Sequence, residues 1–231
     1  MRLRLLCSVV VVLVAVAGIA SAQSSEWRYG GRLSWVNAGT SSDELGDTGS
    51  TFDLQSGLGA EFDATLMFSD LFGVEFSIGT SAHRLELGGG DLGTIDAGRL
   101  WLVPLTAIAQ YHHPIYGPWD PYVGLGMTWA APFYKESGDA NDAGIEEIEF
   151  DGGPAIAAQI GVNYQMDNRW YANIDLRYSG TSLDAQVRTA EENFPTVTLD
   201  AKPLVISLGF GYKFRVQEGG EPTGITCRGG I

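Results

Sequence analysis

Hydrophobic and polar side chains alternate along most of the chain beyond residue 26. The clearest stretch runs from Phe52 to Phe68, where even positions are apolar apart from Ser56 and odd positions include Asp53 and Glu61. A period of two residues is typical of a β-strand with one apolar and one polar face. Strands of soluble domains usually have about 3–10 residues, whereas a tilted strand needs about 9–11 to cross a bilayer. The length of this stretch therefore favours a strand that spans a membrane.

Eight segments carry this alternation, and clusters of Gly, Asn, Asp and Pro separate them. They predict strands at 27–37, 52–68, 71–81, 99–112, 121–134, 153–166, 169–182 and 200–214. Short connections at 69–70, 113–120 and 167–168 alternate with long ones at 38–51, 82–98, 135–152 and 183–199. This rhythm predicts an all-β fold, an eight-stranded antiparallel transmembrane β-barrel with both barrel ends periplasmic and long external loops.

The parity of each strand predicts which side chains meet lipid and which point inward. The lipid-facing set includes Trp170, Ile174 and Leu208, and aromatic residues gather near strand ends. The inward set carries charges of both signs, and we expect these to form an ionic network in the lumen because a buried charge needs a partner. The interior of an eight-stranded barrel is just wide enough for side chains, so the same residues could simply fill it. The predicted lumen ionic network comprises Arg28, Arg32, Glu61, Asp63, Glu75, Asp175, Arg177 and Lys213.

Two strands depart from the alternation. Residues 100–108 and 121–134 are apolar on both faces, and Pro104 within the first of them predicts a bulge or bend because it removes a hydrogen bond from the ladder. An apolar patch in a polar lumen is a candidate binding surface for a small hydrophobic molecule, and tightly packed side chains are the alternative. The predicted lumen apolar patch comprises Leu100, Leu102, Leu125, Met127 and Trp129.

Both ends of the chain differ from this central part. Residues 1–22 have basic residues at 2 and 4, an apolar run and the small residues Ala20-Ser21-Ala22, which predicts a secretory signal peptide cleaved after Ala22. Residues 23–214 are then the outer-membrane β-barrel. Residues 215–231 are rich in glycine and are predicted to form a disordered periplasmic tail.

Charge and motif content narrow the range of functions. Loss of Arg2 and Arg4 with the leader leaves 12 basic and 28 acidic side chains, which argues against nucleic acid as a partner. No residue spacing indicates a metal site, a cofactor or a catalytic centre, so we expect a protein that is not an enzyme. The alternative is a lipid-modifying barrel enzyme, because Ser81, His83 and Asp91 lie close together at the predicted external rim.

Five segments together resemble the outer membrane protein W (OmpW) family in order and spacing. They are WRYGGRLSWVN at 27–37, FSDLFGVEFSIGTSAHRLEL at 68–87, PYVGLGMTWAAPFYKE at 121–136, GVNYQMDNRWYANIDLRYSGTS at 161–182 and GFGYKF at 209–214. His83 falls where the family often has a histidine. The 17 residues after Phe214 depart from the family pattern, in which the final aromatic residue commonly ends the chain.

The resemblance implies a barrel in the outer membrane of a Gram-negative bacterium, in contact with outer-membrane lipids. It also implies a passive path or binding site for small hydrophobic solutes, and external loops that a bacteriocin or phage can use as a receptor. The alternative function is a non-conducting structural or surface-interaction barrel, of the receptor or adhesin kind.

Overall fold

The structure is a computed structural model. It describes residues 26–42, 50–89, 95–113, 115, 117–136, 145–189 and 197–215. The predicted signal peptide and residues 216–231 of the predicted tail lie outside these residues. Among the described residues, no helix is long and apolar enough to cross a membrane.

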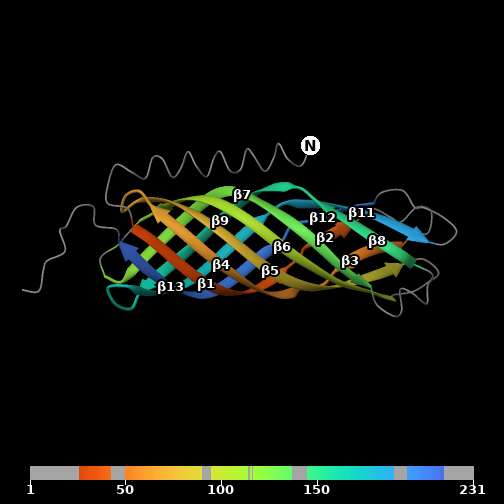
Figure 1. The fold of residues 1–231 in the computed structure, drawn as a ribbon, viewed down its shortest axis with the longest axis horizontal. Helices are drawn as coiled ribbons and strands as arrows, with labels where there is room; N and C mark the ends of the chain where they lie inside the picture. The colour runs from red at the N-terminus through yellow and green to blue at the C-terminus, as the bar shows by residue number, and fades with distance from the viewer. Residues whose placement is uncertain are drawn as a thin grey trace, which may run out of the picture.

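Eight antiparallel strands form a closed barrel, which confirms the predicted fold (Figure 1). Each strand pairs with its neighbours along the chain, and the first strand also pairs with the last, so the sheet has no free edge. The wall strands are β1 (Glu26–Asn37), β4 (Gly57–Met67), β5 (Phe72–Gly89), β6 (Ile95–His112), β7 (Trp119–Glu136), β9 (Pro154–Gln165), β10 (Trp170–Ser179) and β13 (Leu204–Arg215).

Five further strands extend the wall at one end of the barrel (Figure 1). They are β2 (Thr40–Ser42), β3 (Ser50–Leu54), β8 (Ile145–Gly152), β11 (Thr181–Thr189) and β12 (Val197–Ala201). β3 pairs with the outer part of β5, and the other four form a sheet in the order β2-β12-β11-β8. Large parts of the segments predicted as long loops are therefore strands. In β8 the alternation of isoleucine and phenylalanine with acidic residues already carried that signal.

The ends of the barrel chain lie beside the short turns. Glu26 pairs with Arg215 on one side and with Met67 on the other, next to the turn at residues 68–71. In the short turn at residues 167–168 the Asp167 carboxylate accepts hydrogen bonds from the backbone N–H groups of Trp170 and Arg169, at 2.7 Å each. These bonds lower the pKa of Asp167 from its ordinary value. Short turns mark the periplasmic side of outer-membrane barrels, so both barrel ends are periplasmic, as predicted.

The outer face of the barrel is apolar between two bands of aromatic side chains. On β10 and β13 the predicted lipid-facing residues are exposed, which confirms the parity of both strands. Aromatic rings on neighbouring strands contact one another near the short turns, with centroids 4.8 Å apart for Trp119 and Tyr164 and 5.1 Å apart for Trp170 and Tyr212. Amphipathic rings prefer the membrane interface, so these pairs mark the periplasmic border of the bilayer.

The stretch 52–68 is not one continuous strand, because residues 55 and 56 interrupt it between β3 and β4. Within β4 the even positions Leu58 and Phe62 point outward as predicted, whereas Leu54 in β3 is buried. The expectation that all even residues from 52 to 68 share the outer face is therefore wrong at Leu54. Leu54 pairs with Leu85 and Leu58 pairs with Ala82, so four steps along 54–58 oppose three steps along β5. This one extra residue shifts the parity, and an alternation continued through it assigns the wrong face.

A charge placed on the lipid face gives a direct test of this orientation. We expect Leu208→Arg to lower the free energy of unfolding by about 2–4 kcal/mol, because Leu208 is exposed near the middle of β13 and arginine is costly at that depth. Urea titration of the barrel in lipid vesicles measures the change. Asp70→Arg, in an exposed short turn, is the control and should cost little. Equal effects of the two changes would contradict the orientation of β13.

Candidate functional site

Six charged side chains, five of them buried and Glu61 partly buried, meet at the middle of the lumen, and we call them the lumen ion cluster. Arg32 Nε lies 3.1 Å from Asp63 Oδ1, and Arg177 Nη1 lies 2.7 Å from Glu61 Oε2. The two guanidinium groups come from β1 and β10, and the carboxyl groups come from β4, β5 and β10. The lumen ion cluster comprises Arg32, Glu61, Asp63, Glu75, Asp175 and Arg177, and the sequence predicted all six as inward charges.

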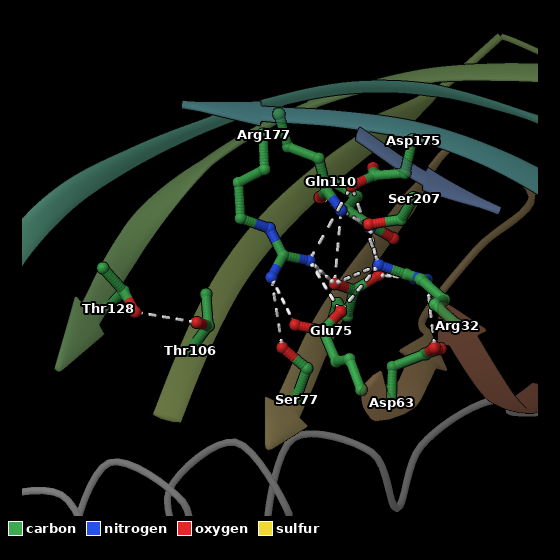
Figure 2. A network of polar contacts seen from close by, with 12 residues as sticks. Arg32, Asp63, Glu75, Ser77, Thr106, Gln110, Thr128, Asp175, Arg177 and Ser207 are labelled. Carbon is green, nitrogen blue, oxygen red and sulfur yellow. Dashed lines mark hydrogen bonds and ion pairs between the residues drawn. The ribbon is translucent and has the colours of Figure 1, made fainter. Parts of the chain in front are cut away.

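Glu75 is the centre of this cluster (Figure 2). Its carboxylate accepts from Arg32 and from Arg177, the latter at 2.9 Å, so one acidic residue joins both cations. The side-chain amides of Gln110 and Gln159 donate to it as well, at 2.9 and 3.2 Å. Four donor groups from four strands therefore converge on a single buried carboxylate, as a buried charge requires.

The other two predicted members of the network lie elsewhere. Arg28 binds Asp120 at 2.8 Å and Glu26 at 2.9 Å, and Asp120 also contacts His112 at 3.1 Å. Lys213 contacts the side chain of Gln165. Arg28 thus pairs with Asp120 and not with the cluster directly, and neutral side chains connect the two: His112 contacts Gln110 at 3.1 Å, and Gln110 donates to Glu75. Residues four positions apart on a strand, such as 28 and 32, are separated by about 13 Å, so they occupy different layers of the lumen.

Neutral polar residues complete the lumen ion cluster, and the sequence interpretation missed them. The Tyr122 hydroxyl donates to Asp175 at 3.0 Å and accepts from Asn173 at 3.0 Å. These residues, like Gln110 and Gln159, are buried on the inward face of their strands. Parity could have found them, because each sits at an inward position of its strand.

Directly on the external side of the ion cluster lies a cavity of about 90 Å³, which we call the upper chamber. Glu61 and Arg177 belong both to the cluster and to the chamber lining, so the ion cluster forms its floor. Hydroxyl groups of Ser34, Thr106 and Thr128 border the floor. The walls above are mainly apolar and include Val36, Ala38, Leu54, Leu102, Pro104 and Val205. The chamber is thus an apolar space on a charged base.

Three of the five residues predicted as a lumen apolar patch face the membrane instead. Leu125, Met127 and Trp129 are 64%, 57% and 40% exposed on the outer face of β7. The hydrogen bond between Thr106 and Thr128, at 2.9 Å inside the barrel, shows which face of each strand is inward. Leu100 is fully buried and Leu102 lines the upper chamber. The prediction failed for β7 because both of its faces lack charge between residues 121 and 134, so hydrophobicity alone could not define the lumen side.

His83 lies inside the barrel and not at an exposed rim. It is 2% exposed and lines the upper chamber next to Ser81. Its Nδ1 lies 2.9 Å from the backbone oxygen of Gln55, and its Nε2 lies 2.9 Å from Ser81 Oγ. Asp91, the acidic partner in the enzyme alternative, lies outside the described residues. Among the residues that the structure places, no group of three or more His, Cys, Asp or Glu side chains could hold a metal ion.

The barrel wall beside the upper chamber is interrupted between β5 and β6. Pairing runs up to Ile78 with Leu105 and resumes at Ser81 with Leu102, and the register is the same on both sides. Residues 79, 80, 103 and 104 lie between, and we call this stretch the wall gap. Pro104 has no N–H to donate and faces Gly79, where an added Cβ would lie 3.5 Å from the proline ring.

The chamber extends to this gap. Its lining includes Pro104 and Gly79 as well as Ala60 and Thr80, which are exposed on the outer face of β4 and β5. Inward and outward residues thus border the same space. The upper chamber therefore reaches the barrel wall at the point where the ladder between β5 and β6 lacks a hydrogen bond, because Pro104 has no N–H.

Outer-membrane proteins are among the known proteins similar to this chain. Outer membrane protein W of Vibrio cholerae is 26% identical over 212 residues, covering 87% of this chain and 97% of the relative. Dibenzothiophene metabolism operon protein PahQ of Pseudomonas aeruginosa is 25% identical over 167 residues, covering 72% and 76%. The crystal structure of the outer membrane protein OprG from Pseudomonas aeruginosa superposes with a TM-score of 0.76 at 22% identity, covering 84% of this chain and 98% of OprG.

The family comparison agrees with the barrel geometry. Residues 31–214 match the OmpW family as a whole, from the middle of β1 to the end of β13. That span includes six wall strands in full, most of β1 and β13, the lumen ion cluster and the wall gap. The chain therefore belongs to the OmpW family of outer-membrane β-barrels.

Proposed function

We propose that this barrel gives small hydrophobic molecules a passive path into the outer membrane, through the upper chamber and out through the wall gap. The observation that carries this proposal is the apolar chamber that reaches an unpaired stretch of the wall. An apolar solute gains by leaving water for apolar walls, and at the wall gap it has to part a ladder that already lacks one hydrogen bond before it meets the hydrocarbon of the bilayer.

The lumen ion cluster supports a sideways exit over a path along the barrel axis. Its six charged side chains, with Gln110, Gln159 and Tyr122, fill the cross-section below the chamber. An apolar molecule that passed through would have to separate buried ion pairs, which is costly in a low-dielectric interior. The gap between β5 and β6 requires no ion pair to break.

One relative supports an apolar cargo by its name. PahQ is named for an operon of dibenzothiophene metabolism, and dibenzothiophene is a flat, neutral, sulfur-containing aromatic compound. The barrel of this chain, with an apolar chamber beside an interrupted stretch of the β5–β6 ladder, fits cargo of that neutral apolar kind.

Uptake by whole cells tests the proposal. Cells that express the full chain should accumulate phenanthrene, a fluorescent aromatic hydrocarbon, faster than cells without it, and uptake of glucose should be unchanged. The rival function, a non-conducting structural or surface-interaction barrel, requires equal phenanthrene uptake by the two strains. That result, with the barrel shown to be present in the outer membrane, would overturn the proposed function.

A further inference from the structure

The polar side chains of the upper chamber differ in how fully they are hydrogen-bonded. Thr106 and Thr128 bond to each other at 2.9 Å, and Ser34 bonds to Ser207 at 2.9 Å. Each of these hydroxyls is matched with another hydroxyl. Ser81 is bound instead by a histidine ring and has apolar neighbours at the chamber wall, where Leu102 is its cross-strand partner.

The bond from His83 to the backbone determines what Ser81 can offer. The carbonyl oxygen of Gln55 can only accept, so Nδ1 of His83 carries a hydrogen. Nε2 then either accepts from the Ser81 hydroxyl or, on a charged ring, donates to it. A serine oxygen has one donor and two acceptor positions. In either case at least one lone pair of Ser81 Oγ is left over beside the chamber, and a hydrogen-bond donor can use it.

The charge of the floor limits which donors are suitable. The lumen ion cluster has two guanidinium groups and four carboxyl groups, and Glu61 lies at the chamber lining. An anionic solute would approach an excess of carboxyl groups, and a cationic one would lose its water against apolar walls. A neutral solute meets neither penalty.

We propose that the upper chamber selects neutral molecules that carry a hydroxyl group on an apolar body, with Ser81 as the group that accepts from the ligand hydroxyl. His83 is a positioning residue, because its bonds to Gln55 and Ser81 fix the direction of the serine hydroxyl. This inference rests on the proposed function and names the class of solute that the chamber prefers: alcohols and phenols over plain hydrocarbons and over carboxylates.

Three probes of similar size separate these classes: phenol, benzene and benzoate. The full barrel, isotope-labelled in lipid nanodiscs, would be titrated with each probe while NMR follows the backbone amides of the chamber residues. We expect phenol to bind about five-fold more tightly than benzene, the effect of one net hydrogen bond, and benzoate to bind more weakly than either. Ser81→Ala should remove the preference for phenol and leave benzene affinity unchanged.

Ser69→Ala is the control, because Ser69 is an exposed serine in a short turn outside the chamber. It should keep the preference for phenol. Equal affinity of the wild-type barrel for phenol and benzene, or tighter binding of benzoate, would overturn the inference and leave the proposed function standing. Binding of none of the three probes would overturn both. The order of affinities in the wild-type protein tests the inference even if Ser81→Ala does not fold.

Discussion

Replacing Glu75 with alanine is expected to lower the free energy of unfolding by about 3–5 kcal/mol, because it removes the shared partner of two buried cations. Arg32 and Arg177 both bind this carboxylate, Gln159 would lose its acceptor, and Nε2 of Gln110 would keep only its bond to Gln159. Urea titration of the barrel reconstituted in lipid vesicles, followed by tryptophan fluorescence, measures the change.

Asp175→Ala is the informative comparison within the same cluster. Asp175 lies 3.9 Å from Arg32 and 4.0 Å from Arg177, and both cations keep closer carboxylate partners when it is removed. The change mainly leaves the Tyr122 hydroxyl without its acceptor, which costs about 1–3 kcal/mol. Asp70→Ala in an exposed turn is the control, and we expect it to stay within about 0.5 kcal/mol of wild type. If Glu75→Ala cost no more than Asp175→Ala, Glu75 would not be the centre of the cluster.

The strands and their outer faces could be predicted because the membrane imposes a strong contrast between faces. In β10, Ile174 and Leu176 meet lipid while Asp175 and Arg177 point inward, so every second residue shows its side by its chemistry. The same contrast indicated which charges enter the lumen. It did not indicate at which depth along the barrel axis each charge lies, because that depth depends on the register between strands. Arg28 and Arg32 lie on the same face of β1 but pair with different carboxylates, Asp120 and Asp63.

Prediction failed where the lumen side of a strand is small and uncharged. The inward positions of β7 include Gly124, Gly126 and Thr128, which differ from the outward Leu125 and Met127 in size more than in polarity. Size was the usable signal between residues 124 and 128, where small residues alternate with the bulky Leu125 and Met127. A hydrophobicity pattern treats glycine as neutral, so it placed the binding surface on the wrong face.

The upper chamber itself could not be read from the sequence. Its lining comes from strands on all sides of the barrel, and residues such as Leu54 and Val205 meet there only through the closed pairing of the sheet. Pro104 did predict a local break in the ladder. That the break lies beside a cavity follows from the register that places Pro104 opposite Gly79.

Pro104→Val should reduce phenanthrene uptake to the level of cells without the protein. Valine restores a backbone N–H to β6 and favours the extended conformation, so the ladder between Ile78–Leu105 and Ser81–Leu102 can close. Closure should also raise the free energy of unfolding by about 0.5–1.5 kcal/mol for each hydrogen bond gained. A loss of uptake together with a gain in stability separates closure of the gap from damage to the barrel.

Pro132→Val is the matched control for this change. Pro132 also lies inside a wall strand, but its pairing with Leu102 belongs to a β6–β7 register that is continuous from Gly98–Glu136 to His112–Tyr122. Valine at 132 leaves the wall gap as it is, so uptake should stay at the wild-type rate. If Pro104→Val were more stable than wild type and still took up phenanthrene at the wild-type rate, solutes would not leave through the wall gap. The exit would then have to lie along the barrel axis, past the ion pairs of Arg32 and Arg177.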